Sequence, residues 1–179
     1  SLRSSLKTDL AVAERNAREL EGLAVRALDE LRRLVSDLRP SQLDDLGLVA
    51  TLRWFAQEVE SRSGIAVNFE APSPRVALPP ELNTVLFRIA QEALTNVVRH
   101  ADAEHVTLRL QIAEAEVRLV VKDDGQGFEV GQVLASLRGP EAWGLVGMQE
   151  RAALVGGRCH IASTPGQGTE VTVVVSLEK

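Results

Sequence analysis

The stretch RIAQEALTNVVRHADA (residues 88–103) decides how this sequence is interpreted. Its apolar residues recur at spacings of three and four, which predicts an amphipathic helix. Four polar residues of the same stretch also share one face of that helix. They are Glu92, Asn96, Arg99 and His100. An acid, an amide and two potential cations on one face indicate either a solvated surface or one wall of a binding site.

The chain has 179 residues, of which 45% are hydrophobic, enough for one good-sized domain and an additional segment. Its net charge is −5 without any basic block, so we expect no nucleic-acid partner. The single Cys159 excludes an internal disulfide. Apolar runs such as VTVVV (171–175) are too short to span a membrane, and no signal peptide is visible. Because the chain begins at Ser1 rather than Met, we interpret it as a fragment of a longer protein. We expect this fragment to be cytoplasmic and to make no membrane contact itself, whether or not its parent protein is membrane-anchored.

Residues 2–38 carry an apolar residue at alternating spacings of four and three, which predicts one long helix packed lengthwise against others. The alternative is a single helix that lies on its own domain. Pro40 ends the pattern, so residues 1–40 are interpreted as a stalk helix and residues 41–179 as a separate domain. The apolar seam consists of Leu6, Leu10, Ala13, Ala17, Leu20, Ala24, Ala27, Leu31, Leu34 and Leu38.

The remaining sequence alternates between helical and strand patterns. Helices are predicted over residues 48–63, 80–101 and 144–156. Strands are predicted over residues 65–69, 105–112, 116–123, 158–163 and 169–176. Residues 129–143 are irregular, with one short helix at most. Since strands and helices do not alternate regularly, the order predicts an α+β fold, a two-layer sandwich with helices on one face of the sheet.

Three side chains of the helix over residues 80–101 suit a nucleoside triphosphate. Asn96 is an indifferent helix former, but its amide oxygen is a good neutral ligand for Mg²⁺. Glu92, one turn earlier, could orient or deprotonate a nucleophile beside that metal. Arg99, one turn later, could neutralise phosphate charge. On this helix alone, a solvated face with an acid–Arg pair is the commoner arrangement.

The turn DDGQGF (123–128) is a second candidate. Asp123 closes an apolar strand and could accept a hydrogen bond from an exocyclic amine such as that of adenine. Gly125 and Gly127 permit positive φ and a close approach of the backbone to a ligand. Asp-Gly turns are common, so this motif is weak evidence by itself.

Two further glycine motifs follow. In GLVGM (144–148), Gly144 and Gly147 open a helix whose N–H groups and dipole suit phosphate, although neither a Walker A nor a Rossmann pattern is present. GQGTEV (166–171) places Thr169 at the start of the last strand. By itself, this last motif is typical of an ordinary hairpin turn.

In this order and at these spacings, the four motifs resemble the N, G1, G2 and G-T boxes of the GHKL ATPases. The segments LRPSQLDDLGLVATLRWFA (38–56), QEALTNVVRHA (91–101) and GLVGMQERAALVGG (144–157) resemble the sensor histidine kinase branch linked to NarL-type response regulators. The resemblance covers about residues 31–176. It implies a Bergerat ATP-binding fold, a two-layer α/β sandwich with a mixed sheet, preceded by a long stalk helix.

The resemblance also implies roles for individual residues, with ATP and Mg²⁺ as cofactors. Glu92 would be the catalytic residue and Asn96 the Mg²⁺ ligand, while Asp123 would bind the adenine amine with Thr169 supporting it through water. Residues 128–143 would form a lid over ATP, hinged by glycines, and Asp124 replaces the Asn often found at its position. The expected nucleotide-binding residues are Asn96, Arg99, His100, Asp123, Gly125, Gly127, Gly144, Leu145, Gly147, Met148 and Thr169.

The family's phosphoacceptor histidine is missing from this chain. Residues 18–21 (RELE) resemble the acceptor motif with Glu21 in place of histidine, but only 16 residues separate Glu21 from Leu38, too few for a return helix. We therefore interpret residues 1–40 as the second helix of the dimerisation hairpin, with the acceptor upstream of Ser1. His105 and His160 are interpreted as surface or strand residues rather than ligands.

The sequence thus predicts the ATP-binding catalytic domain of a sensor histidine kinase in a two-component phosphorelay. In the parent protein, a homodimer through the stalk, the γ-phosphoryl group of ATP would pass to a histidine and then to an aspartate of a NarL-type response regulator. The fragment alone is not expected to autophosphorylate. The alternatives are another GHKL ATPase, such as a serine kinase that antagonises a sigma factor, and a nucleotide-binding dimerisation module without turnover. The stalk argues against the first alternative, and intact Glu92 and Asn96 argue against the second.

Overall fold

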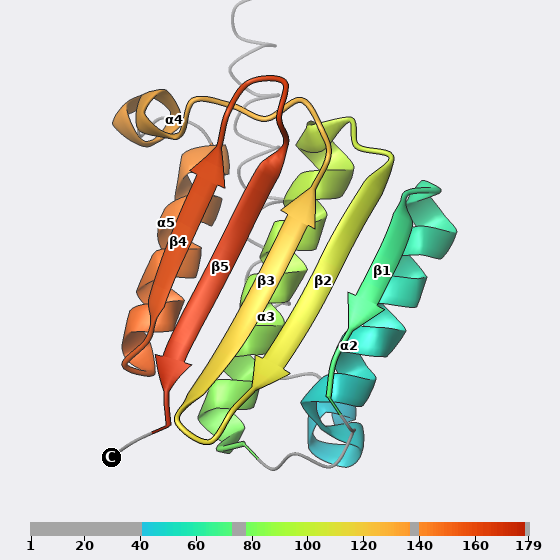
Figure 1. Cartoon of the computed structure of the whole chain (residues 1–179), viewed down its shortest axis with the longest axis vertical. Coiled ribbons are helices and arrows are strands. Elements are labelled where there is room, and N and C mark those ends of the chain that lie inside the picture. The colour runs from blue at the N-terminus through green and yellow to red at the C-terminus, as the bar shows by residue number, and fades with distance from the viewer. Residues whose placement is uncertain (1–40, 73–77, 137–139, 178–179) are drawn as a thin grey trace, which may run out of the picture. The chain divides into compact units, whose positions relative to one another are not determined.

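The computed structural model describes residues 41–72, 78–136 and 140–177. Within these residues, five strands form a sheet that lies beside one layer of helices (Figure 1). Along each strand, apolar residues that are buried or partly buried in the core recur at every second position. The strands are β1 (Ala66–Glu70), β2 (His105–Ile112), β3 (Glu116–Asp123), β4 (Arg158–Ser163) and β5 (Thr169–Ser176). The predicted bounds of the last four strands are confirmed. The predicted stalk, residues 1–40, lies outside the described residues.

The strands form a mixed sheet in the order β1–β2–β3–β5–β4. Every neighbouring pair is antiparallel except β1 and β2, which are parallel. A helix connects these two strands, and such a crossover is the usual way to join parallel neighbours. The predicted two-layer sandwich with a mixed sheet is confirmed. The order of elements had not indicated this one β–α–β crossover.

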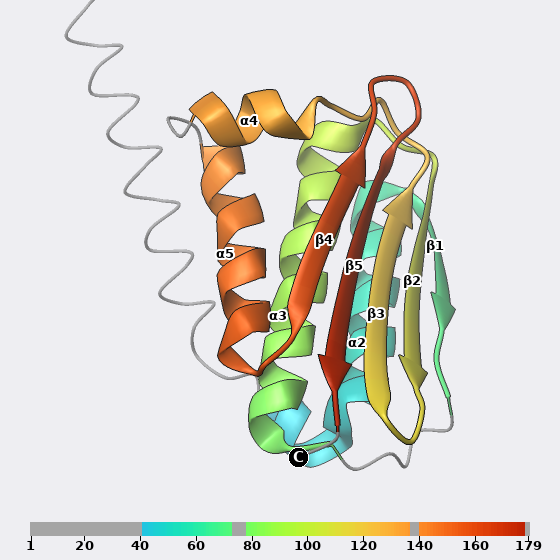
Figure 2. The same cartoon turned by 60° about the vertical axis from the view of Figure 1, so that its left-hand side comes forward.

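Among the residues that the structure describes, helices cover one face of the sheet and leave the other face uncovered, as Figure 2 shows. Helix α2 packs on β1, α3 lies behind the centre of the sheet, and α5 packs on β4 and β5. The helical elements are α2 (Ser41–Ser63), α3 (Pro80–Asn96), η1 (Val97–Ala101), α4 (Val130–Ser136) and α5 (Pro140–Leu154). Figure 2 shows that α4 lies across the end of α5, and α4 also contacts β4. None of the helices that the structure describes could cross a membrane, given their lengths and apolar content.

The helix that contains residues 88–101 changes from α-helical to π-helical geometry in its last turn. Pro80 begins α3, where a proline is tolerated because its missing N–H would be unpaired anyway. One side of α3 is buried in the core, including Leu86, Ile89 and Leu94. The predicted extent to Ala101 is confirmed, but the last turn is a π-helix, η1. This wider turn directly follows Asn96 and ends at Asp102, which has a left-handed backbone (φ 51°).

The other face of the sheet carries charged side chains. Glu70 and Arg109 form an ion pair of 2.6 Å across β1 and β2, and Lys122 and Glu170 lie 3.4 Å apart across β3 and β5. This face therefore has the character of a solvated surface. The apolar interior lies between the sheet and the helices.

Candidate functional site

A pocket of about 310 Å³ opens where α3 and η1 meet the ends of β3 and β5. Its walls are largely apolar, and polar groups gather on the side of η1 and the turn after β3. The apolar lining consists of Ala93, Val97, Ala101, Val121, Phe128, Val133, Leu145, Met148 and Val171. The other lining residues are Asn96, Arg99, His100, Gln126, Gly127 and Thr169.

The pocket brings together residues from all four sequence motifs. The predicted site residues that line it are Asn96, Arg99, His100, Gly127, Leu145, Met148 and Thr169. The other predicted residues, Glu92, Asp123, Gly125, Gly144 and Gly147, do not line the pocket. The contacts of Glu92, Asp123, Gly125 and Gly144 place these four residues next to the lining or next to one another.

Asp123 joins two of the motifs from behind the pocket. It ends β3, and only 6% of its surface is exposed. Its Oδ1 accepts hydrogen bonds from the N–H of Gly125 at 2.9 Å and from the N–H of Thr169 at 3.2 Å. Burial raises the pKa of Asp123, and these two N–H donors oppose that rise. Both hydrogen bonds end at Oδ1, so Oδ2 is the atom that suits an additional donor.

Gly125 and Gly127 are required for two different reasons. Gly127 has a positive φ of 60°, a backbone conformation that favours glycine. Gly125 does not, but a Cβ on it would collide with the carbonyl of Ala101. The sequence indicated close approach to a ligand. In the structure, Gly125 instead allows the turn after β3 to approach the end of η1.

Glu92 lies against α5 rather than in the pocket. A Cβ on Gly144 would collide with the Glu92 carboxylate and would lie 3.7 Å from Nδ2 of Asn96. The third motif therefore packs directly on the first. The prediction that Gly144 opens a helix is wrong, because α5 begins at Pro140. Gly144 and Gly147 lie inside α5, and the unpaired N–H groups at its start belong to residues before Gly144.

Sequence reasoning missed two polar residues that organise the site. Gln126 lines the pocket, and its Nε2 donates a hydrogen bond to the His100 carbonyl at 2.6 Å. The Ser163 hydroxyl accepts from the N–H of Phe128 at 2.9 Å and lies 2.9 Å from Oγ1 of Thr169. Gln126 could have been noticed as part of DDGQGF. Ser163 has no local signal, because its partners lie far from it in the sequence.

The donor set fits Mg²⁺ only together with a ligand that brings oxygen atoms. The described residues contain no group of three or more His, Cys, Asp or Glu side chains that could hold a metal ion. Mg²⁺, however, commonly takes one or two protein oxygens and completes its shell with substrate phosphates and water. The Asn96 amide at the pocket provides one such oxygen.

Comparison with known proteins identifies the family. Residues 82–179 match the family of histidine kinase-, DNA gyrase B-, and HSP90-like ATPases. This match covers more than half of the chain, so the chain belongs to that family. Membership implies that the domain binds ATP.

Individual relatives are histidine kinases by name. The chain is 36% identical over 176 residues to an uncharacterized sensor-like histidine kinase of Chloroflexus aurantiacus, covering 97% of this chain and 30% of the relative. It is 34% identical to the signal transduction histidine-protein kinase/phosphatase DegS of Brevibacillus brevis, covering 92% of this chain and 41% of DegS. It is 38% identical to the oxygen sensor histidine kinase NreB of Staphylococcus carnosus, covering 90% and 46%. The chain thus spans less than half the length of each of these relatives.

Solved structures show the same fold. The histidine kinase domain of the Erythrobacter litoralis EL346 blue-light activated histidine kinase aligns with a TM-score of 0.62 at 22% identity, over 76% of this chain and 69% of that domain. A second structure of EL346 aligns with a TM-score of 0.66 at 24% identity, over 85% of this chain and 50% of that chain. Together with the sequence relatives, the family match confirms the prediction of a sensor histidine kinase catalytic domain.

Proposed function

We propose that this chain is the part of a sensor histidine kinase that binds Mg-ATP and donates its γ-phosphoryl group to a histidine, which passes it to an aspartate of a response regulator. The observation that carries the proposal is the pocket, around which residues of four separated motifs meet. The relatives are named histidine kinases, which favours this function over a serine kinase or a module without turnover.

The proposed binding mode follows from the lining. The apolar walls suit a purine ring. Asp123, whose Oδ1 accepts the N–H of Thr169, would accept a hydrogen bond from the exocyclic amine through its Oδ2. Arg99 and His100 suit the phosphates, and Asn96 suits Mg²⁺. When bound, Mg²⁺ would supply charge neutralisation to the phosphates. Gly125, Gly127, Gly144, Leu145, Gly147 and Met148 complete the proposed nucleotide-binding set.

In the proposed reaction, the bond from the γ-phosphorus to its bridging oxygen breaks, ADP leaves, and a P–N bond forms at the acceptor imidazole. Glu92, one turn before Asn96, would orient that imidazole and accept its proton. Positioning would supply most of the catalysis, as is usual for phosphoryl transfer. The acceptor is proposed to lie upstream of Ser1, so the chain alone should not autophosphorylate.

The metal assignment is tested by replacing Asn96 with alanine. We expect the affinity for Mg-ATP to fall about tenfold, because an oxygen ligand is lost, while ATP binding in EDTA should hardly change. Titration calorimetry with and without Mg²⁺ measures both affinities. Asn68→Ala is the matched control, since the Asn68 side chain is exposed on the charged face of the sheet and donates a hydrogen bond to Glu70. Equal losses with and without Mg²⁺ would contradict the assignment.

Residues 128–143 are proposed to form the lid. The N–H of Phe128 is fixed by Ser163, and α4, which follows, contributes Val133 to the pocket. Hydrogen exchange of the α4 amides should therefore slow when Mg-ATP binds. The backbone amides that hydrogen-bond β2 to β3 serve as an internal reference, and they should exchange slowly in both states. Equal α4 protection with and without nucleotide would contradict the lid.

The proposed organisation assigns residues 1–40 to the second helix of the dimerisation hairpin and residues 41–179 to the catalytic domain. The whole protein would dimerise through the stalk and act on a NarL-type response regulator in the cytoplasm. We expect the 179-residue chain to self-associate weakly through its apolar seam. Sedimentation of this chain beside one that starts at Ser41 tests the stalk. Monomers in both cases would contradict its role.

A further inference from the structure

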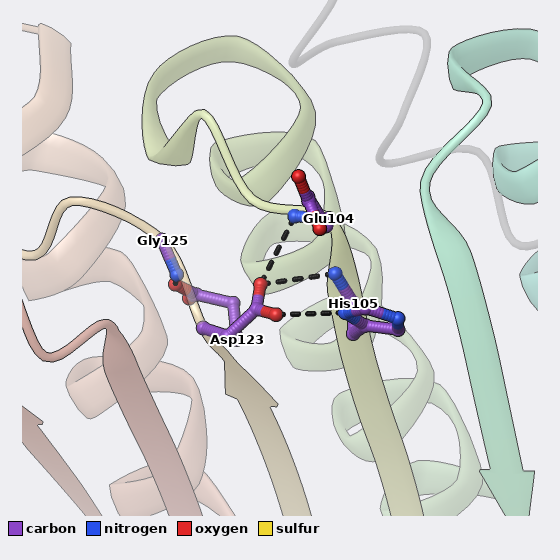
Figure 3. Close-up of polar contacts among 5 residues, drawn as sticks. Glu104, His105, Asp123 and Gly125 are labelled. Atoms are coloured by element: carbon purple, nitrogen blue, oxygen red, sulfur yellow. Dashed lines mark hydrogen bonds and ion pairs between the residues drawn. The ribbon is translucent and has the colours of Figure 1, made fainter.

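The carboxylate of Asp124 holds the start of β2. Its Oδ1 accepts hydrogen bonds from the N–H of Glu104 at 3.0 Å and of His105 at 2.9 Å, and its Oδ2 lies 2.8 Å from Nδ1 of His105. Figure 3 draws these contacts as dashed lines that end at the labelled Glu104 and His105. The backbone and ring donors of His105 lower the pKa of Asp124. Asp124 does not line the pocket. Its side chain therefore fixes the loop between η1 and β2 rather than contacting a ligand there.

The next two residues hold the end of η1. Gln126 donates a hydrogen bond from Nε2 to the His100 carbonyl at 2.6 Å and from its backbone N–H to the Ala101 carbonyl at 2.7 Å. Gly125 approaches Ala101 so closely that a Cβ would collide with the Ala101 carbonyl. Three consecutive residues, 124–126, thus contact the continuous segment 100–105.

These contacts connect the two ends of the pocket. Asp123, at the proposed adenine end, directly precedes residues 124–126, and Asn96, at the proposed metal end, precedes η1 and the segment that they hold. The last carbonyl groups of a helix have no partner within it, and Gln126 binds two of them here. Residues 124–126 therefore link the end of β3 directly to the helical wall of the pocket.

We propose that residues 124–126 form a clamp that fixes the adenine end of the nucleotide pocket relative to its phosphate end, with Asp124 and Gln126 as positioning residues. The proposal rests on the proposed binding of Mg-ATP. It assigns a role in affinity to Asp124, a residue outside the pocket lining, and explains why an acid or an amide suits its position. Either side chain offers an oxygen to the N–H groups of Glu104 and His105, whereas alanine offers none.

Two substitutions at the same position test the clamp. Asp124→Ala removes all three contacts and should weaken Mg-ATP binding about tenfold, in line with the effect of losing groups that orient a binding residue. Asp124→Asn should restore affinity close to that of the parent chain. Its Oδ1 can accept from both backbone N–H groups, and its amide can donate to an unprotonated His105 ring. Titration calorimetry on the 179-residue chain gives the affinities, and thermal melting confirms that each variant folds.

A matched control separates the clamp from loss of any surface acid. Glu70 also bonds a side chain on a neighbouring strand, Arg109, but it lies on the charged face of the sheet. Glu70→Ala should leave Mg-ATP affinity unchanged. Gln126→Met keeps the length of the side chain, removes the donor to His100, and should weaken binding in the same direction as Asp124→Ala.

The outcomes are distinct. If the parent chain does not bind Mg-ATP, the proposed function is wrong and the clamp is wrong with it. If the parent binds and a folded Asp124→Ala chain binds equally well, or Asp124→Asn binds as weakly as Asp124→Ala, the clamp alone is overturned. Should Asp124→Ala fail to fold, parental affinity in Gln126→Met would overturn the clamp.

Discussion

Replacing Asp123 with asparagine should weaken ATP binding about a hundredfold, or about 2.7 kcal/mol, while the chain remains folded. The Asn side chain can still accept the N–H groups of Gly125 and Thr169 through its Oδ1, so the link between the two motifs should persist. Its second atom becomes an NH₂ donor, which would face the donor amine of adenine. Titration calorimetry measures the affinity, and thermal melting confirms the fold.

Two comparisons make this result specific to the adenine contact. Asp123→Ala should lose both the ligand contact and the two internal hydrogen bonds, so its melting temperature should fall below that of Asp123→Asn. Inosine triphosphate carries a carbonyl oxygen where adenine carries the amine. The Asp123→Asn chain should therefore bind inosine triphosphate more tightly than the parent does. Unchanged ATP affinity in both variants would contradict the adenine assignment.

The strands of the second half could be predicted to the residue because their signal is local. In β2 and β3, apolar residues alternate along the whole strand, and turn residues bound each of them. The start of α5 was predicted wrongly although it also carries a local signal. Pro140 is a typical first residue of a helix, but the glycine at position 144 was interpreted as the opening of the helix. The wide turn of η1 had no signal, because five residues are too few for an apolar period to distinguish a π-helix from an α-helix.

In the candidate site, too, the features with a local sequence signal could be predicted and those that depend on tertiary contacts could not. Helical spacing placed Asn96, Arg99 and His100 on one face, and all three line the pocket. No spacing rule could link Asp123 to Thr169 or Ser163 to Phe128, because those contacts depend on how β3, β4 and β5 pair. Helical spacing therefore indicated the wall that one helix builds, and the resemblance to the family indicated Gly127, Leu145, Met148 and Thr169 of the other wall. The hydrogen bonds that hold the other wall follow from tertiary structure.

Substitution of Glu92 should affect the rate of phosphoryl transfer much more than the affinity for Mg-ATP. The residue lies one turn before Asn96, outside the pocket lining, with its carboxylate against Gly144 of α5. In a chain extended upstream to include an acceptor histidine, Glu92→Gln should keep Mg-ATP affinity nearly unchanged. Phosphoryl transfer should slow by about a hundredfold to ten-thousandfold, the usual contribution of a general base, because glutamine has the same length but cannot accept the proton.

Single-turnover transfer from labelled ATP measures the chemical step, and calorimetry measures affinity separately. Glu81→Gln is the matched control, because Glu81 lies exposed in the first turn of the same helix. It should transfer at the parental rate. If Glu92→Gln lowered affinity and transfer equally, Glu92 would act in binding or in supporting α5 instead of accepting a proton. If it transferred at the parental rate, the residue would have no catalytic role, and the polar face of α3 and η1 would serve the metal and the phosphates alone.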